Sequence, residues 1–324
     1  MDSVEEDFAV LFTIDRVQFS YSKQQYYFYE FMEIPNIKLL IMTSNFWETL
    51  YSMINDIERK KLTFLLNNQL NTVKIFIFYQ RGVNCFIKIE INPHLNQTFG
   101  NVWEFKDIQK WFRGLNNIDG DSRSKGLGAT KSENIDYYVN GLLRLLYDKE
   151  DYQDDNGLEL TKKLLDGDTT KGFDLDLLQY IQSTNEYIIY EFLKRENSYI
   201  SNIQAHPMRY CWTGRRNDNK QKFISLWNIK QFLNGRLFLI NYSDDDNERV
   251  SIIEVLDLDA NKGILEEKKY CMSKNVFIGW LRDMNHYSSS SNNYLADFKC
   301  VHYDKQFFRN FNDNKKRYGS EFLI

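Results

Sequence analysis

Apolar residues occur in short runs along the first third of the chain, and turn-forming residues separate the runs. Such bounded runs, rich in β-branched and aromatic residues, are typical of β-strands. We expect strands over Phe8–Ile14, Tyr26–Phe31, Ile37–Met42, Val73–Tyr79 and Cys85–Ile91. Between Ser44 and Lys61 the apolar residues instead follow a helical spacing, which predicts one helix with Ser44 as its N-cap. Asp107–Arg113 is predicted as another short helix.

Helical and strand patterns alternate in the second half of the chain. Helices are predicted over Ser132–Asp148, Leu158–Leu165, Asn219–Leu233 and Lys274–Met284, and strands over Gly172–Ile181, Glu186–Arg195, Arg236–Tyr242 and Val250–Asp257. This order of elements predicts a mixed β-sheet flanked by helices. The expected fold class is therefore α/β, of a mixed α+β kind, with a β-rich N-terminal part. No internal repeat is evident in the sequence.

The stretch Asn116–Lys131 contains almost no apolar residues but three glycines, which is typical of a loop or linker. Two domains are also the natural expectation for 324 residues. We therefore predict a recognition or partner-binding domain over residues 1–118, a linker over 119–131 and a catalytic domain over 132–324.

Composition narrows the possible functions. No run of about 18 apolar residues is present, so no membrane-spanning helix is expected. The first eight residues are acidic, which is unlike a secretory signal. The four cysteines are scattered without a CxxC pair, and the four histidines lack metal-binding spacing. These features indicate a cytoplasmic protein without a zinc site or a disulfide framework.

Acidic residues and a lysine mark one predicted hairpin. Asp174 and Asp176 lie near the start of its first strand, and Glu191 and Lys194 lie near the end of its second strand. In an antiparallel hairpin that turns at 183–185, these positions lie opposite each other. Clustered carboxylates are hard oxygen ligands that suit Mg²⁺ or Mn²⁺. A cation held there can activate water and stabilise the charge of a scissile phosphate.

With these residues, the segment 132–257 resembles the PD-(D/E)XK (restriction-endonuclease-like) nuclease superfamily. In that family an Asp starts a hairpin, a Glu-x-Lys lies on the next strand, and a helix and another strand follow. The resemblance implies a magnesium-dependent DNA endonuclease of restriction or phage-defence type. It implies that Asp174 or Asp176 is the first metal ligand, Glu191 the second and Lys194 the catalytic lysine, with Glu159 as an auxiliary acid.

This chain departs from the family pattern at the lysine. It reads Glu191-Phe192-Leu193-Lys194, and residues three apart on a regular strand point to opposite faces. Lys194 reaches Glu191 only through a β-bulge, and without a bulge another lysine, such as Lys222, must serve. The other interpretation of this hairpin is that its charges only keep an edge strand soluble.

The segment from Lys194 to Lys222 carries seven positive and two negative residues, a local charge of +5 in a chain of net charge −4. Such a segment is typical of a surface that contacts phosphates. The residues predicted to bind nucleic acid are Arg195, Arg209, Arg215, Arg216, Lys220 and Lys222. DNA is the expected partner, RNA is not excluded, and a homodimer is compatible with cleavage of both strands. The alternative is a non-catalytic nucleic-acid-binding or protein-interaction module. His206 could supply a general base, although a single loop histidine is more often structural.

Overall fold

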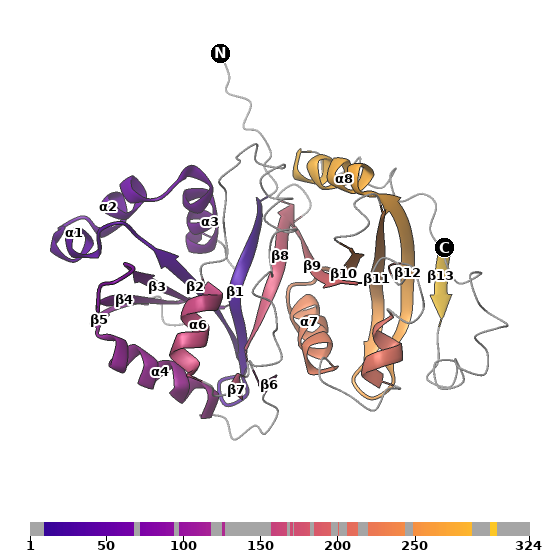
Figure 1. Cartoon of the computed structure of the whole chain (residues 1–324), viewed down its shortest axis with the longest axis horizontal. Helices are drawn as coiled ribbons and strands as arrows, with labels where there is room; N and C mark the ends of the chain where they lie inside the picture. Colours follow the sequence, from indigo (N-terminus) through magenta and orange to yellow (C-terminus); the bar gives the residue numbers. More distant parts are fainter. Residues whose placement is uncertain are drawn as a thin grey trace, which may run out of the picture. The chain divides into compact units, whose positions relative to one another are not determined.

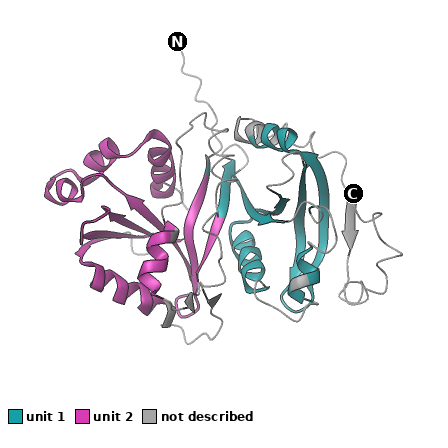
Figure 2. Cartoon of the chain, in the orientation of Figure 1, with its two compact units in different colours: residues 1–11, 137–152, 176–324 teal, residues 12–136, 153–175 magenta. Residues whose placement is uncertain are grey.

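The computed structural model is a mixed α/β protein, as expected from the sequence, and Figure 1 labels its elements. The structure describes residues 10–67, 72–93, 97–117, 125–126, 157–166, 169–170, 172–181, 185–195, 200, 206–212, 220–243, 249–286 and 299–302. Figure 2 distinguishes two compact units. Unit 1 comprises residues 1–11, 137–152 and 176–324, and unit 2 comprises residues 12–136 and 153–175.

The strands of unit 2 follow one another in the order β1-β2-β3-β4-β5. They are β1 (Val10–Ser20, in this unit from Phe12 onward), β2 (Gln25–Glu33), β3 (Val73–Tyr79), β4 (Phe86–Asn92) and β5 (Gln97–Trp103). β2 and β3 are parallel, and the other neighbours are antiparallel. A parallel pair needs a crossover, which here runs through α1 (Ile37–Met42), α2 (Phe46–Met53) and α3 (Asp56–Asn67). The remaining elements are α4 (Phe105–Asn117), α6 (Gly157–Leu165) and the short pair β6 (Lys125–Gly126) and β7 (Thr169–Thr170).

The two faces of β2 bury different partners because side chains alternate along a strand. Phe31 and the tyrosines of one face belong to the same buried cluster as residues of α4 and α6. On the other face, Lys61 of α3 forms an ion pair with Glu30, and the ring of Phe64 lies 5.1 Å from that of Phe12. The face that carries Glu30 is therefore covered by α3.

The strands of unit 1 follow the order β13-β12-β11-β10-β9-β8. They are β8 (Phe173–Ile181, in this unit from Asp176 onward), β9 (Glu186–Lys194), β10 (Arg236–Tyr242), β11 (Arg249–Asp259), β12 (Gly263–Ser273) and β13 (Lys299–His302). β9 and β10 are parallel, and the other neighbours are antiparallel. The π-helical turn η4 (Met208–Trp212) and the helix α7 (Lys220–Phe232) lie on the crossover, and α8 (Lys274–His286) follows β12.

The two units repeat one arrangement of elements. Each begins with an antiparallel hairpin, crosses through helical segments to a strand parallel to the second hairpin strand, and continues with two antiparallel strands and a helix of 13 residues. The registers also correspond, because Glu30 of β2 pairs with Phe76 of β3, and Glu191 of β9 pairs with Leu239 of β10. The expectation that the chain has no internal repeat is therefore wrong.

The repeat is visible in the sequence once the hairpins are superimposed. Residues 12–31 match residues 173–192 without a gap, at a constant spacing of 161 positions. The two turns share a left-handed residue at the same place, Gln24 with φ 51° and Asn185 with φ 52°. The identical pairs are Phe12 and Phe173, Asp15 and Asp176, Gln18 and Gln179, Ser22 and Ser183, Tyr26 and Tyr187, Tyr29 and Tyr190, Glu30 and Glu191, and Phe31 and Phe192.

Two predicted elements of the N-terminal part differ from the structure. Ile37–Met42 is a helix and not a strand: the Asn36 side chain accepts a hydrogen bond from the Leu39 amide, and only Ile37 and Leu40 are buried. The single helix predicted from Ser44 to Lys61 is divided into α2 and α3. The division follows from Asn55, whose side chain caps the start of α3.

The boundary between the units differs from the predicted linker. Residues 153–175 belong to unit 2, because Leu160, Leu164 and Leu165 of α6 are buried in the core formed with β2, β3 and α4. The strands β5 and β12 were not predicted, and the predicted helix Ser132–Asp148 lies outside the described residues. None of the helices in the described ranges is long and apolar enough to cross a membrane.

Candidate active site

Asp176 stands where the hydrogen-bonded ladder between β8 and β9 ends. The ladder runs from Ile181 opposite Glu186 to Leu177 opposite Tyr190, so Asp176 is the next residue and faces Glu191. Its side chain replaces the backbone as acceptor, since the Phe192 amide donates a hydrogen bond of 2.6 Å to Asp176 Oδ2. The predicted approach of Asp176 and Glu191 is thus found in the structure.

Lys222, in the first turn of α7, completes the cluster. Its Nζ lies 2.8 Å from Glu191 Oε1 and 3.7 Å from Asp176 Oδ1. All three side chains are largely buried, with 16% of Lys222, 12% of Asp176 and 5% of Glu191 exposed. With both carboxylates ionised and the lysine protonated, this unit 1 triad (Asp176, Glu191 and Lys222) carries one net negative charge in a poorly solvated place.

Lys194 does not take part in the triad. β9 pairs with β10 in a continuous register from Ile188 to Lys194, without the β-bulge that Lys194 would need. The regular strand places Lys194 and Glu191 on opposite faces, and Lys194 is exposed at the strand end. The alternative lysine considered from the sequence, Lys222, is the one beside Glu191.

Asp174 and Glu159, the other predicted acids, lie in unit 2. The charge of Asp174 acts on Arg16, whose pKa is lowered by burial to about 10 and is raised in part by Tyr29 and Asp174. The Glu159 carboxylate accepts a hydrogen bond of 2.6 Å from Lys163, one turn along α6. Each of these carboxylates thus has a local electrostatic partner in its own unit.

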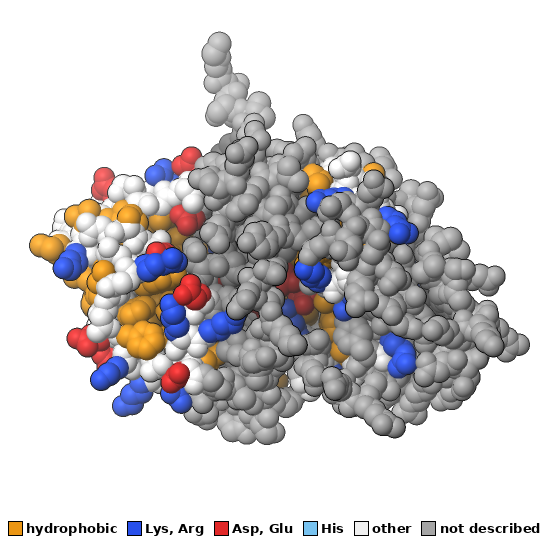
Figure 3. All heavy atoms as spheres, viewed as in Figure 1, with side chains coloured by type: hydrophobic (Ala, Val, Ile, Leu, Met, Phe, Trp, Pro, Cys, Tyr) orange, Lys and Arg blue, Asp and Glu red, His pale blue; other side chains and the backbone are white. Residues whose placement is uncertain are grey.

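The residues predicted to bind nucleic acid lie on different elements of unit 1, and two of them lie outside the described residues. Arg195 is held at the end of β9, where its Nε donates to Asn241 Oδ1 and its amide to the Tyr242 carbonyl. Arg209 is half-buried in η4, and Lys220 begins α7 two residues before Lys222. Arg215 and Arg216 lie outside the described residues. On the face of unit 2 visible in Figure 3, basic and acidic side chains intermingle.

Three residues that the sequence analysis missed reproduce the triad in unit 2. Lys61 Nζ lies 2.6 Å from Glu30 Oε2, and the Phe31 amide donates a hydrogen bond of 2.7 Å to Asp15 Oδ2. Asp15, Glu30 and Lys61 each precede their counterparts in unit 1 by 161 positions. We call them the unit 2 triad. The shared pattern Asp-x-x-Gln followed by Tyr-x-x-Tyr-Glu-Phe is the signal that would have found them.

The chemistry of the donors limits which ligands fit the unit 1 triad. Asp176 and Glu191 offer carboxylate oxygens, which prefer hard cations such as Mg²⁺ or Mn²⁺. Among the residues described, no three His, Cys, Asp or Glu side chains converge as a ready-made metal site. Mg²⁺ is commonly held by one or two carboxylates together with water and substrate phosphates, so two carboxylates fit that cation.

His206 is unsuited to act as a general base. It is 2% exposed, its Nδ1 accepts from the Met208 amide, and its Nε2 therefore donates to Glu267 Oε2 at 2.7 Å. Burial lowers the pKa of His206 although Glu267 acts in the opposite direction. The histidine is a structural element of the unit 1 core.

Comparison with protein-family models, with curated proteins and with solved structures finds no match to this chain. A functional assignment therefore depends on the geometry of the two triads.

Proposed function

We propose that unit 1 is a divalent-cation-dependent phosphodiesterase that cleaves nucleic acid, with DNA as the expected substrate. The observation that carries the proposal is the convergence of two carboxylates and one ammonium group from β8, β9 and α7. The sequence of hairpin, helix and parallel strand agrees with the order of elements that the resemblance to the PD-(D/E)XK nucleases implies.

The residues of the unit 1 triad have distinct parts in this proposal. Asp176 and Glu191 would hold the cation, and the amide of Phe192 fixes the orientation of the Asp176 carboxylate. A bound divalent cation supplies charge neutralisation at the phosphate and lowers the pKa of water. Lys222 would release Glu191 when the substrate arrives and donate to a phosphate oxygen. Lys220, two residues before Lys222 in α7, and Arg195, at the end of β9, would add positive charge for the nucleic acid backbone.

A non-catalytic fold is the second candidate, and one observation favours it. Lys222 already lies within hydrogen-bonding distance of Glu191, and Asp176 caps the Phe192 amide, so each acid has a structural role. In that case the triad would only fix the packing of α7 on the hairpin.

Plasmid cleavage with Mg²⁺ or Mn²⁺ separates the two candidates. We expect Glu191→Gln to reduce kcat by about 10²-fold or more, because the lost charge acts on the transition state. Asp257→Asn serves as the control, since Asp257 is an exposed carboxylate of β11 in the same unit. Cleavage by the folded wild-type chain that persists in EDTA, or an unchanged kcat of Glu191→Gln, would exclude this centre.

A further inference from the structure

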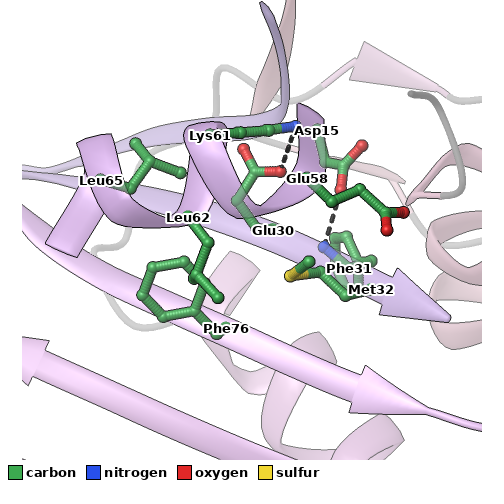
Figure 4. Close-up of a pocket in the computed structure, with 9 residues that line it drawn as sticks. All are labelled: Asp15, Glu30, Phe31, Met32, Glu58, Lys61, Leu62, Leu65 and Phe76. Carbon is green, nitrogen blue, oxygen red and sulfur yellow. Dashed lines mark hydrogen bonds and ion pairs between the residues drawn. The ribbon is translucent and has the colours of Figure 1, made fainter. Parts of the chain in front are cut away.

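The unit 2 triad lines a cavity within its own unit (Figure 4). The cavity has a volume of about 20 Å³, which is enough for one water molecule or one small cation. Asp15 and Glu30 lie on its polar side with Lys61. The apolar wall is formed by Leu62, Leu65 and Phe76. Cysteine and histidine do not occur among the residues that line it. A place with carboxylate oxygen donors suits a hard cation better than zinc or copper.

Glu58 also lines this cavity, but its carboxylate has a separate role. Glu58 Oε2 accepts a hydrogen bond from the Asn55 amide, while Asn55 Oδ1 accepts from the Glu58 amide. This reciprocal pair is a capping box that begins α3. The other two carboxylates that line the cavity, Asp15 and Glu30, are the counterparts of Asp176 and Glu191.

Burial of the charged residues of the unit 2 triad costs free energy of folding, so their presence needs an explanation other than stability. The Lys61 and Glu30 side chains are 8% and 4% exposed. Removing such an ion pair from water costs several kcal/mol per ion, and well-packed apolar residues often replace it without loss of stability. Some apolar neighbours differ between the units, for example Phe28 where unit 1 has Ile189, and others are the same, such as Phe31 and Phe192; the three charged residues are identical.

We infer that unit 2 holds a second divalent-cation site, with Asp15 and Glu30 as its carboxylate ligands beside the ammonium group of Lys61. This inference rests on the proposed function of the unit 1 triad. One chain then binds two divalent cations.

Counting bound Mn²⁺ by electron paramagnetic resonance, with the full chain and MnCl₂ alone, tests the second centre independently of activity. We expect two Mn²⁺ per wild-type chain, one for Glu30→Gln, one for Glu191→Gln and none for the double variant. Glu33→Gln is the matched control on the same strand, because Glu33 pairs with Arg81 and does not line the cavity. It should retain two.

Paramagnetic broadening in the wild-type chain gives a second measurement that needs no variant. Bound Mn²⁺ should broaden the amide signals of both Phe31 and Phe192, which donate to Asp15 and Asp176. One Mn²⁺ per chain, lost in Glu191→Gln and kept in Glu30→Gln, with Phe31 unbroadened, would overturn the second centre and leave the proposed function intact. Two bound Mn²⁺ without any plasmid cleavage would refute the nuclease and support the second cation centre.

Discussion

Replacing Lys222 by methionine removes the positive charge of the unit 1 triad but keeps most of the side-chain volume. At an effective dielectric constant of about 20, the separations of 2.8 and 3.7 Å correspond to gross attractions of about 6 and 4.5 kcal/mol. The methionine avoids the desolvation cost of the ammonium, which offsets much of this loss. We therefore expect Lys222→Met to lower the free energy of unfolding by about 3–5 kcal/mol.

Urea denaturation at pH 7.5 measures this change in the free energy of unfolding, and two further variants serve as comparisons. Lys262→Met, at an exposed turn position of the same unit, should change the free energy of unfolding by less than about 0.5 kcal/mol. The double variant Glu191→Gln with Lys222→Met should recover part of the loss, because fewer uncompensated charges remain buried. A loss below about 1 kcal/mol in Lys222→Met would show that the triad is well solvated, contrary to the buried geometry.

A cation centre adds a further expectation for the same variant. Without Lys222, Asp176 and Glu191 should bind Mn²⁺ more tightly, since no ammonium competes for their oxygens. At a concentration 100 times the Kd, Mn²⁺ should then restore about 2.7 kcal/mol of the free energy of unfolding. Equal stabilisation of Lys222→Met and of Lys262→Met by Mn²⁺ would show that the cation does not bind at these carboxylates.

Three other changes test the packing and the buried charges. The pKa of the His206 imidazole is lowered from 6.5, so its contribution to the free energy of unfolding is complete above about pH 6.5 and is lost as the pH falls toward the folded pKa, by up to about 1.4 kcal/mol per pH unit. In urea melts between pH 7.5 and 5, the wild type should therefore lose more stability than His206→Gln. Parallel curves for the two proteins would contradict this expectation. Leu164→Ala should cost about 2–5 kcal/mol in urea melts because Leu164 is fully buried between α6 and the core, and a cost below about 1 kcal/mol would place α6 outside that core. Gly235→Ala should lower the free energy of unfolding by about 1–3 kcal/mol, because a Cβ there would lie 2.4 Å from the Tyr187 carbonyl oxygen. At Gly114 in α4 a Cβ meets no atom within 4 Å, so Gly114→Ala should stabilise the chain. Equal midpoints of the two variants in thermal melts would refute this contrast.

The hairpin of unit 1 could be predicted from the sequence because its information is local. Alternating apolar residues define β8 and β9, and the turn between them fixes the register within narrow limits. The approach of Asp176 to Glu191 follows directly from that register. The choice of lysine could not be settled in this way, because the position of Lys222 depends on how α7 packs on the hairpin.

Other elements were harder to predict for related reasons. Ile37–Met42 is a short apolar run, and such a run fits a strand or a buried helical turn equally well. The placement of α6 in unit 2 depends on Leu160, Leu164 and Leu165 finding a core that lies more than 40 residues earlier in the chain. The repeat is hard to see in the sequence because its longest identical block, Tyr29–Phe31 and Tyr190–Phe192, has three residues, and positions such as Arg16 and Leu177 differ even in polarity.

The repeat itself gives a reason to regard the triads as functional. Between the two hairpins, some buried apolar side chains have changed, such as Val17 where unit 1 has Leu178, and others are the same, such as Tyr29 and Tyr190, while the Asp, Glu and Lys of the triads are identical. Stability alone does not favour this pattern, because apolar residues can replace a buried ion pair at little cost. Capping of the Phe31 and Phe192 amides accounts for the aspartates but not for the Glu and Lys pairs. A ligand that needs carboxylates and an ammonium group in one place accounts for all three.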